Sequence, residues 1–283
     1  MKKIVLILAS VAITLTSTAQ KVALHTSSGV QHFNGTGALQ SAYTAALAGD
    51  TLYLSGHTFT PPANFEKQLT IYGAGHYVDS TLATGKTFIN GNVNLRENAD
   101  HFHIEGVEIT GNLVLGNNES INGLVVKYCK INGVLNIPGN LSNPSSNLSF
   151  YGNVFSTLDI PNAENVLISN NIIYALSNTN GNNISNNIFF WKTYLYVEYG
   201  GGENNHHIII GDNNQIQNNI FIQPNRIWGN GNTIQNNIFN NSNQNFGFTP
   251  TITGNYIGIP QADIFVNQTG TTFNYTHDYH LQD

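Results

Sequence analysis

The sequence is poor in cysteine and in charge. Its 283 residues include one Cys, and only 9% of them are Asp, Glu, Lys or Arg. A single thiol excludes an internal disulfide framework and a thiolate zinc cluster, because both need several cysteines. Ten Lys and Arg stand against sixteen Asp and Glu. This balance leaves no basic patch of the kind that nucleic acids bind, so we expect no nucleic-acid partner.

Long apolar runs are scarce as well. Residues 4–15 form one such run, which follows Lys2 and Lys3 and precedes the small residues 17–19. This order is typical of a secretory signal peptide, here residues 1–19, cleaved near Ala19. The run is shorter than the about 20 residues that a membrane-spanning helix needs. We therefore predict an exported protein, secreted or at the cell surface, with no membrane span.

Asparagine, in contrast, is abundant and occurs at regular positions in the sequence. The chain has 44 Asn, and 26 of them lie between residues 151 and 250. The pattern Ile-Ser/Gln-Asn-Asn-Ile occurs four times, at residues 168–172, 184–188, 216–220 and 234–238. Weaker copies begin at residues 104, 126, 150 and 252. The Asn pairs are therefore locked in phase with Ile, as a structural repeat requires and a low-complexity linker does not.

The spacing of the repeats predicts the fold class. Neighbouring copies start 16 to 24 residues apart, except for a step of 32 from Ile184 to Ile216, which fits two short repeats or one repeat with an excursion. Short apolar runs bounded by turn residues fill the repeats, and this is typical of strands. A unit this small cannot bury its own apolar face, so the copies must stack. We predict an all-β parallel solenoid with Asn-rich coils over about residues 100–260.

Stacking gives the asparagines a structural role. Successive coils lie about 4.8 Å apart, so equivalent residues fall above one another. Asn tolerates the left-handed conformation of a tight turn, and its amide can donate to one coil while accepting from another. We therefore predict a ladder of hydrogen-bonded Asn side chains.

The N-terminal part has a different character. Residues 38–47 carry a short helix with one apolar face, and strands follow at residues 51–54 and around residues 69–71, ahead of Gly73 and Gly75. This order resembles the opening of the right-handed parallel β-helix proteins of the pectin-lyase-like superfamily, where such a helix covers the first coil. The resemblance implies a right-handed solenoid forming one domain over residues 20–283, with an N-terminal cap at about residues 36–60.

The same resemblance says little about function, because that superfamily holds bacterial polysaccharide lyases, glycoside hydrolases, adhesins and secreted proteins of unassigned role. In related bacterial secreted proteins, sequence segments similar to residues 264–267 and 278–281 are followed by additional residues. We therefore expect the native chain to continue beyond Asp283.

Catalytic patterns are not evident. A glycoside hydrolase needs two carboxyl groups about 5–10 Å apart, and the sequence has no Asp-Asp or Asp-x-Asp. Its two arginines, Arg96 and Arg226, have no neighbouring acidic cluster of the kind that pectate lyases use. Residues 212–214 lack the Gly and Glu of a calcium loop, so we interpret them as a turn. We predict no cofactor and no metal; a polysaccharide lyase or hydrolase stays the alternative, because distant acids can meet across stacked coils.

The asparagine phase breaks between Ile188 and Ile216, and there we place the candidate site. Aromatic residues with polar neighbours precede Gly200–Gly202, where a loop could leave the solenoid. Rings flanked by polar groups suit a sugar, although an ordinary aromatic stack on a solenoid face fits the same pattern, and Lys192 or a Tyr could act as a lyase base. The predicted substrate-binding residues are Lys192, Tyr194, Tyr196, Glu198, His206, His207, Arg226 and Trp228.

Two further patterns are weaker. Strand alternation would place His101, His103 and Glu105 on one face, where histidines can share a metal, but no further ligand is apparent. An ice-binding surface would need a regular Thr array, whereas Thr51, Thr70 and Thr87 look out of phase with the repeat. The sequence therefore favours a non-catalytic extracellular module that contacts a polysaccharide or cell-surface glycan.

Overall fold

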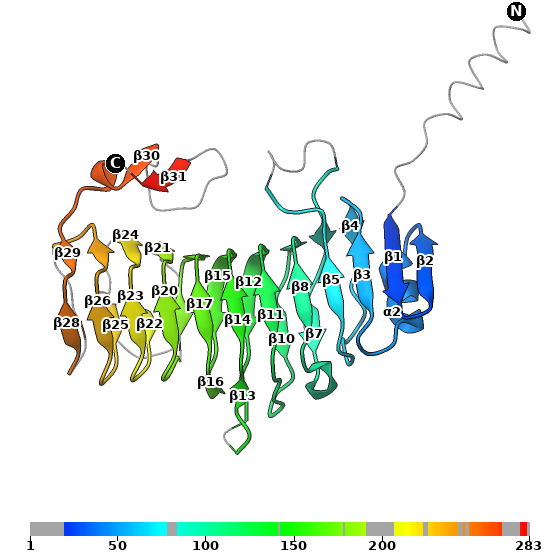
Figure 1. The fold of residues 1–283 in the computed structure, drawn as a ribbon, viewed down its shortest axis with the longest axis horizontal. Coiled ribbons are helices and arrows are strands. Elements are labelled where there is room, and N and C mark those ends of the chain that lie inside the picture. The colour runs from blue at the N-terminus through cyan, green and yellow to red at the C-terminus, as the bar shows by residue number, and fades with distance from the viewer. Residues whose placement is uncertain are drawn as a thin grey trace, which may run out of the picture.

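The computed structural model describes residues 20–77, 84–140, 142–177, 179–190, 207–222, 226–242, 246, 249–267 and 278–281. It is a parallel β-solenoid drawn out along one axis (Figure 1). Most coils contribute one strand to each of two long sheets, which we call sheet A and sheet B. The predicted all-β solenoid is confirmed.

Sheet A contains ten parallel strands that stack along the axis. They are β3 (Thr51–Leu54), β5 (Thr70–Tyr72), β8 (His103–Glu105), β11 (Val125–Lys127), β14 (Ser149–Tyr151), β17 (Leu167–Ser169), β20 (Asn183–Ser185), β23 (Gln215–Gln217), β26 (Thr233–Gln235) and β28 (Thr251–Thr253).

Sheet B follows sheet A in each coil, after a short turn except between β5 and β6. Its main path holds β4 (Thr58–Phe59), β6 (Phe88–Ile89), β9 (Glu108–Ile109), β12 (Lys130–Asn136), β15 (Val154–Asp159), β18 (Ile172–Ile173), β21 (Ile188–Phe190), β24 (Ile220–Ile222), β27 (Ile238–Phe239) and β29 (Tyr256–Ile257). Beside this path lie β7 (Val93–Leu95), β10 (Leu113–Leu115), β19 (Leu176–Ser177), β22 (His207–Ile210) and β25 (Arg226–Trp228).

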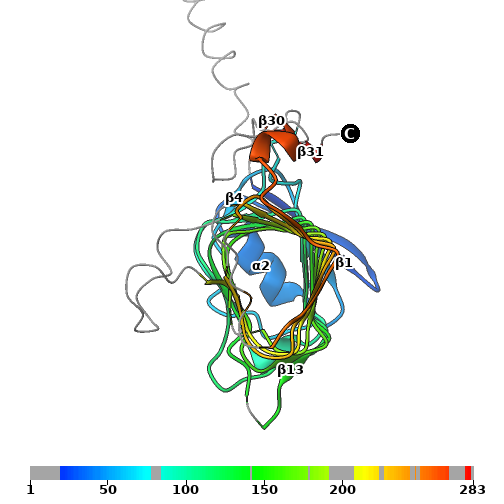
Figure 2. The ribbon, with the colours of Figure 1, turned by 90° about the vertical axis from the view of Figure 1, so that its left-hand side faces the viewer.

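The solenoid is right-handed. Figure 2 looks along its axis with the C-terminal coils nearest the viewer, and the chain passes from sheet A on the right to sheet B at the top and back along the left. A chain that turns counterclockwise while it approaches the viewer forms a right-handed coil, as the resemblance implied.

The repeat starts predicted from the sequence are register partners in sheet A. Every predicted repeat start pairs with the next one along sheet A, from Ile104 with Val126 through to Ile234 with Ile252. Ile184 pairs directly with Ile216. The 32-residue step is therefore a single coil and not two short coils.

The predicted asparagine ladder is present, and the two residues of each Asn pair have different structural roles. The first, such as Asn186 with φ of 57°, takes the left-handed conformation, and Gly152 and Gly254 replace it in the weaker copies. The second is buried, and its amide donates to the amide oxygen in the following coil at 3.0–3.1 Å. The ladder runs through Asn153, Asn171, Asn187, Asn219, Asn237 and Asn255.

A second, shorter ladder lies at the turn that leads back into sheet A. The Asn182 backbone N–H donates to the Asn214 amide oxygen at 3.1 Å, and the Asn214 N–H donates to that of Asn232 at 2.8 Å. All three residues are buried. Asp212 and Asn213 belong to this turn, and Asn213 has a φ of 59°, so the turn interpretation of residues 212–214 is confirmed.

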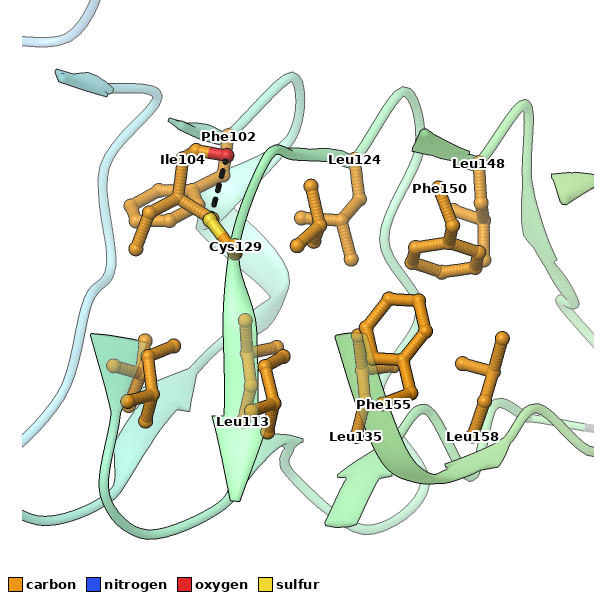
Figure 3. Packing of buried hydrophobic residues seen from close by; sticks show 14 of the residues in the cluster. Phe102, Ile104, Leu113, Leu124, Cys129, Leu135, Leu148, Phe150, Phe155 and Leu158 are labelled. Atoms are coloured by element: carbon orange, nitrogen blue, oxygen red, sulfur yellow. Dashed lines mark hydrogen bonds between the residues drawn. The ribbon is translucent and has the colours of Figure 1, made fainter. Parts of the chain in front are cut away.

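The interior is a column of apolar side chains from both sheets. Figure 3 shows Phe150 of sheet A facing Phe155 of sheet B, with ring centroids 6.0 Å apart. Farther along, Phe189, Phe221 and Phe239 stack face to face at 4.8 and 4.7 Å. These rings are fully buried, so the stacking of coils also stacks the core.

The N-terminal end is closed as predicted, with one addition. Helix α2 (Ala38–Ala45) lies across the opening of the solenoid (Figure 2), and its buried Leu39 joins the core. Strands β1 (Lys21–Thr26) and β2 (Gly29–Asn34) form an antiparallel hairpin that pairs with β3 and extends sheet A. The sequence did not reveal this hairpin.

The C-terminal segment covers part of sheet B from outside. Beyond the short helix η3 (Gln261–Asp263), Ile264 and Phe265 pack against outward-facing residues of β15, β18 and β24, and they are nearly fully buried. Strand β30 (Phe265–Asn267) then pairs antiparallel with β31 (Asp278–Leu281). In the described part of the chain, no helix is long and apolar enough to cross a membrane.

Candidate functional site

The site predicted from the sequence lies mostly outside the described residues. Those outside are Lys192, Tyr194, Tyr196, Glu198 and His206. The backbone places His207 at the start of β22 opposite Arg226 at the start of β25, and Trp228, which is partly buried, lies opposite Ile210. Three predicted positions therefore share two neighbouring strands, and the remainder of the site stays a prediction.

A second candidate lies on the outer face of sheet A, towards its N-terminal end. In the three-residue strands of sheet A from β5 to β26 the middle side chain is buried in the core, so the first and third point outwards. The third positions of five successive strands are register partners about 4.8 Å apart. They are Tyr53, Tyr72, Glu105, Lys127 and Tyr151. With His103 and Tyr128 beside them, these residues form what we call the sheet A platform.

The aromatic rings of the platform contact one another along the solenoid axis. Tyr53 stacks on Tyr72 with ring centroids 5.4 Å apart and an interplanar angle of 22°. The next ring, His103, meets Tyr72 edge to face at 5.5 Å. Aromatic pairs at such distances hold each other in place by about 0.5–1.5 kcal/mol beyond burial. The row is therefore a preformed surface.

Charged groups continue the row into the next coils. His103 Nε2 lies 3.2 Å from Glu105 Oε2, and Lys127 Nζ lies 3.7 Å from the same oxygen. Lys127 Nζ also sits 4.9 Å from the centre of the Tyr128 ring, within range of a cation–π interaction. The carboxylate is thus held between an imidazole and an ammonium group.

Glycine at one position makes room for the last ring pair. A Cβ on Gly152 would lie 2.5 Å from the Tyr128 ring. Without that Cβ, Tyr128 rests edge to face against Tyr151 with centroids 5.5 Å apart. The side chains of Tyr53 and Tyr128 are 47% and 43% exposed. Both ends of the platform therefore present aromatic surface to solvent.

The suggested metal pair is not formed on this face. His101 has a φ of 58° and lies in a turn ahead of β8, which begins at His103. Its ring packs against Gly123, where an added Cβ would lie 2.3 Å from His101 Nδ1. The expected alternation from His101 to Glu105 is therefore wrong, because the strand does not extend that far. Among the described residues, no three His, Cys, Asp or Glu side chains are grouped to hold a metal.

The threonine phase also differs from expectation. Thr51 and Thr70 are register partners on the outer face of sheet A, so they are in phase with the repeat. Their column continues with His103, and Thr87 is fully buried. The column holds Thr again only at Thr233 and Thr251, so its threonines form two separate pairs and not a continuous array.

A polar cluster on sheet B contrasts with the platform. Glu108 is only 6% exposed and accepts hydrogen bonds of 3.0 Å from Lys130 and Asn132. Burial alone would raise the pKa of Glu108, but these two hydrogen bonds and the positive charges of Lys130 and Lys86 outweigh it and lower the pKa below its usual value. Burial also lowers the pKa of neighbouring His76 to about 4. The cluster is too enclosed to offer Glu108 to a large ligand.

Comparison of the chain with protein-family models, with curated proteins and with solved structures gave no match. The structure shows a parallel β-solenoid closed by an N-terminal helix, and membership of the pectin-lyase-like superfamily stays a prediction from the sequence.

Proposed function

We propose that this protein is an extracellular module that binds a polysaccharide or cell-surface glycan through the sheet A platform. The observation that carries the proposal is the row of four tyrosines and one histidine, interleaved with a carboxylate and an ammonium group, on the outside of a parallel sheet. Sugars offer C–H faces that stack on aromatic rings and hydroxyls that bond polar groups. The platform supplies both kinds of partner.

Binding fits this face better than hydrolysis. A glycoside hydrolase needs two carboxyl groups flanking the bond that breaks. Of the platform residues only Glu105 carries a carboxylate, and it already contacts His103 and Lys127. We therefore favour a non-catalytic role, and the predicted export signal at residues 1–19 would deliver the module to where glycans occur.

Removal of two rings tests the proposal. Affinity electrophoresis of the protein through gels containing different polysaccharides identifies a retarding glycan, and titration then gives its Kd. At about 0.5–1.5 kcal/mol for each ring, a Tyr53→Ala/Tyr72→Ala variant should bind roughly 5- to 150-fold more weakly. Tyr256→Ala is the matched control, because Tyr256 is 65% exposed but lies on sheet B. Equal weakening by both variants would refute the assignment.

A further inference from the structure

We infer that the outer face of sheet A takes an uncharged, hydroxyl-rich glycan and discriminates against polyanionic ones. The inference rests on the proposed function and deepens it by naming the chemical class of the ligand. It depends on how charge is distributed over this face.

The ten parallel strands of sheet A present two outward columns of side chains. The first column reads Thr51, Thr70, His103, Val125, Ser149, Leu167, Asn183, Gln215, Thr233 and Thr251. The second reads Tyr53, Tyr72, Glu105, Lys127, Tyr151, Ser169, Ser185, Gln217, Gln235 and Thr253. Glu105 and Lys127 are the only Asp, Glu, Lys or Arg residues in the two columns, although the chain contains ten Lys and Arg and sixteen Asp and Glu.

These two charges neutralise each other. They occupy adjacent positions in the same column, with Lys127 Nζ 3.7 Å from Glu105 Oε2. Beyond β3, the hairpin adds Lys21 on β1, outside the row of rings. An anionic polymer on the platform would compete with Glu105 for Lys127, and it would approach a chain whose formal charge is −6. A neutral polymer meets neither cost.

The half of the face beyond the platform offers neutral hydrogen-bonding groups. From β17 to β28 the outward columns consist of Ser, Asn, Gln and Thr, apart from Leu167. The Asn, Gln and Thr residues are exposed or partly exposed, whereas Ser169 and Ser185 are buried. Gln235 Nε2 donates to Gln217 Oε1 at 2.8 Å, so the amides are held in a column of their own. Amides and hydroxyls both donate and accept, as sugar hydroxyls do.

The dimensions of the face suit an extended chain. The platform spans four strand spacings from β3 to β14, roughly 19 Å, and the whole face spans nine, roughly 43 Å. Because the rings follow one another from coil to coil, a chain lying along the solenoid axis would contact all of them. We expect affinity to rise with chain length over this range.

Matched pairs of polymers test the inference. Hydroxyethyl cellulose against carboxymethyl cellulose, and dextran against dextran sulfate, share a backbone and differ in charge. The protein should bind the neutral member of a pair at least about fivefold more tightly, the equivalent of about 1 kcal/mol of charge repulsion. Tighter binding of the charged member, weakened by Tyr53→Ala/Tyr72→Ala, would overturn the inference and leave the proposed function standing. Binding of neither member of any pair would overturn both.

Two variants show whether the Glu105–Lys127 pair sets the preference. Glu105→Gln removes the neutralising carboxylate and should raise affinity for the charged polymers several-fold at low salt, with the gain lost at high salt. Lys127→Gln should not raise it. An unchanged preference in Glu105→Gln would refute the role assigned to the pair.

Discussion

Replacement of Asn187 by Ala tests how far the asparagine ladder stabilises the solenoid. Asn187 is 1% exposed, and its amide oxygen accepts hydrogen bonds from the backbone N–H and the amide of Asn171, at 2.9 and 3.0 Å. Its own amide donates to Asn219 Oδ1 at 3.0 Å and to the Ile168 carbonyl at 2.8 Å. One side chain therefore links three coils.

The magnitude follows from the groups left without partners. In Asn187→Ala, the Asn171 N–H and one hydrogen of its amide lose their acceptor in the core. An unsatisfied buried polar group costs about 1–3 kcal/mol, so we expect a loss of about 3–4 kcal/mol in the free energy of unfolding. The neighbouring Asn186 provides the control. Its side chain is exposed and its φ is 57°, which glycine adopts freely.

Urea denaturation followed by circular dichroism measures the difference. Asn186→Gly should change the free energy of unfolding by less than about 0.5 kcal/mol, whereas Asn187→Gly should lose as much as Asn187→Ala. The denaturant slope should be the same for all variants, so that the midpoints can be compared. If Asn186→Gly and Asn187→Gly are equally stable, the ladder does not contribute as described.

Three further predictions concern the core and its buried groups. Phe221→Ala, which removes the middle ring of the Phe189–Phe239 stack, should cost about 3–5 kcal/mol in urea denaturation; a loss below about 1 kcal/mol would contradict the packing. Burial raises the pKa of the Cys129 thiol to about 12, so it should react with a thiol reagent at pH 8 only as fast as the protein unfolds, and rapid labelling of native protein would show that it is accessible. Burial holds the pKa of His76 at about 4, below its ordinary value of 6.5. The unfolded chain therefore binds the proton more readily, and the free energy of unfolding decreases as the pH is lowered. Between about pH 7 and 5 this loss should be about 2 kcal/mol and should disappear in His76→Gln; an unchanged pH dependence in the variant would refute it.

The fold could be predicted from the sequence because each repeat contains residues that identify its register with the next repeat. An Asn pair next to an Ile fixes both the turn and the inward residue, so the alignment of Ile184 with Ile216 was already visible, although not the choice between one coil and two. The one apolar face of residues 38–47 likewise indicated α2. The β1–β2 hairpin contains no copy of the repeat, so the sequence pattern did not indicate it.

The C-terminal segment that covers part of sheet B was not predicted, for a different reason. Residues 188–190 and 220–222 are continuous apolar runs, which is typical of strands buried on both faces. The segment that covers their outer face was not predicted from the sequence. Their outward side chains in fact form a second apolar cluster with Ile264 and Phe265. The signal was present in the composition of these strands, but the partner segment lies far along the chain.

The sheet A platform was missed because Tyr53 and Tyr72 precede the Asn-rich coils and its other residues lie in or next to the weaker copies of the repeat. Tyr53, Tyr72 and Tyr151 each directly follow an inward aliphatic or Phe residue, and this position is outward in every coil. The signal could have been read once the register was known. From the sequence alone, the long step between Ile71 and Ile104 hid the alignment.

Footprinting with and without a bound neutral polysaccharide tests the central claim most directly. Hydroxyl-radical oxidation followed by mass spectrometry reports the exposure of individual tyrosines. The account predicts that the glycan protects Tyr53, Tyr72, Tyr128 and Tyr151 and leaves Tyr256 unprotected. Protection confined to residues 191–206, with the platform tyrosines oxidised as before, would place the glycan on the segment of the sequence between β21 and β22 and contradict the assignment to sheet A.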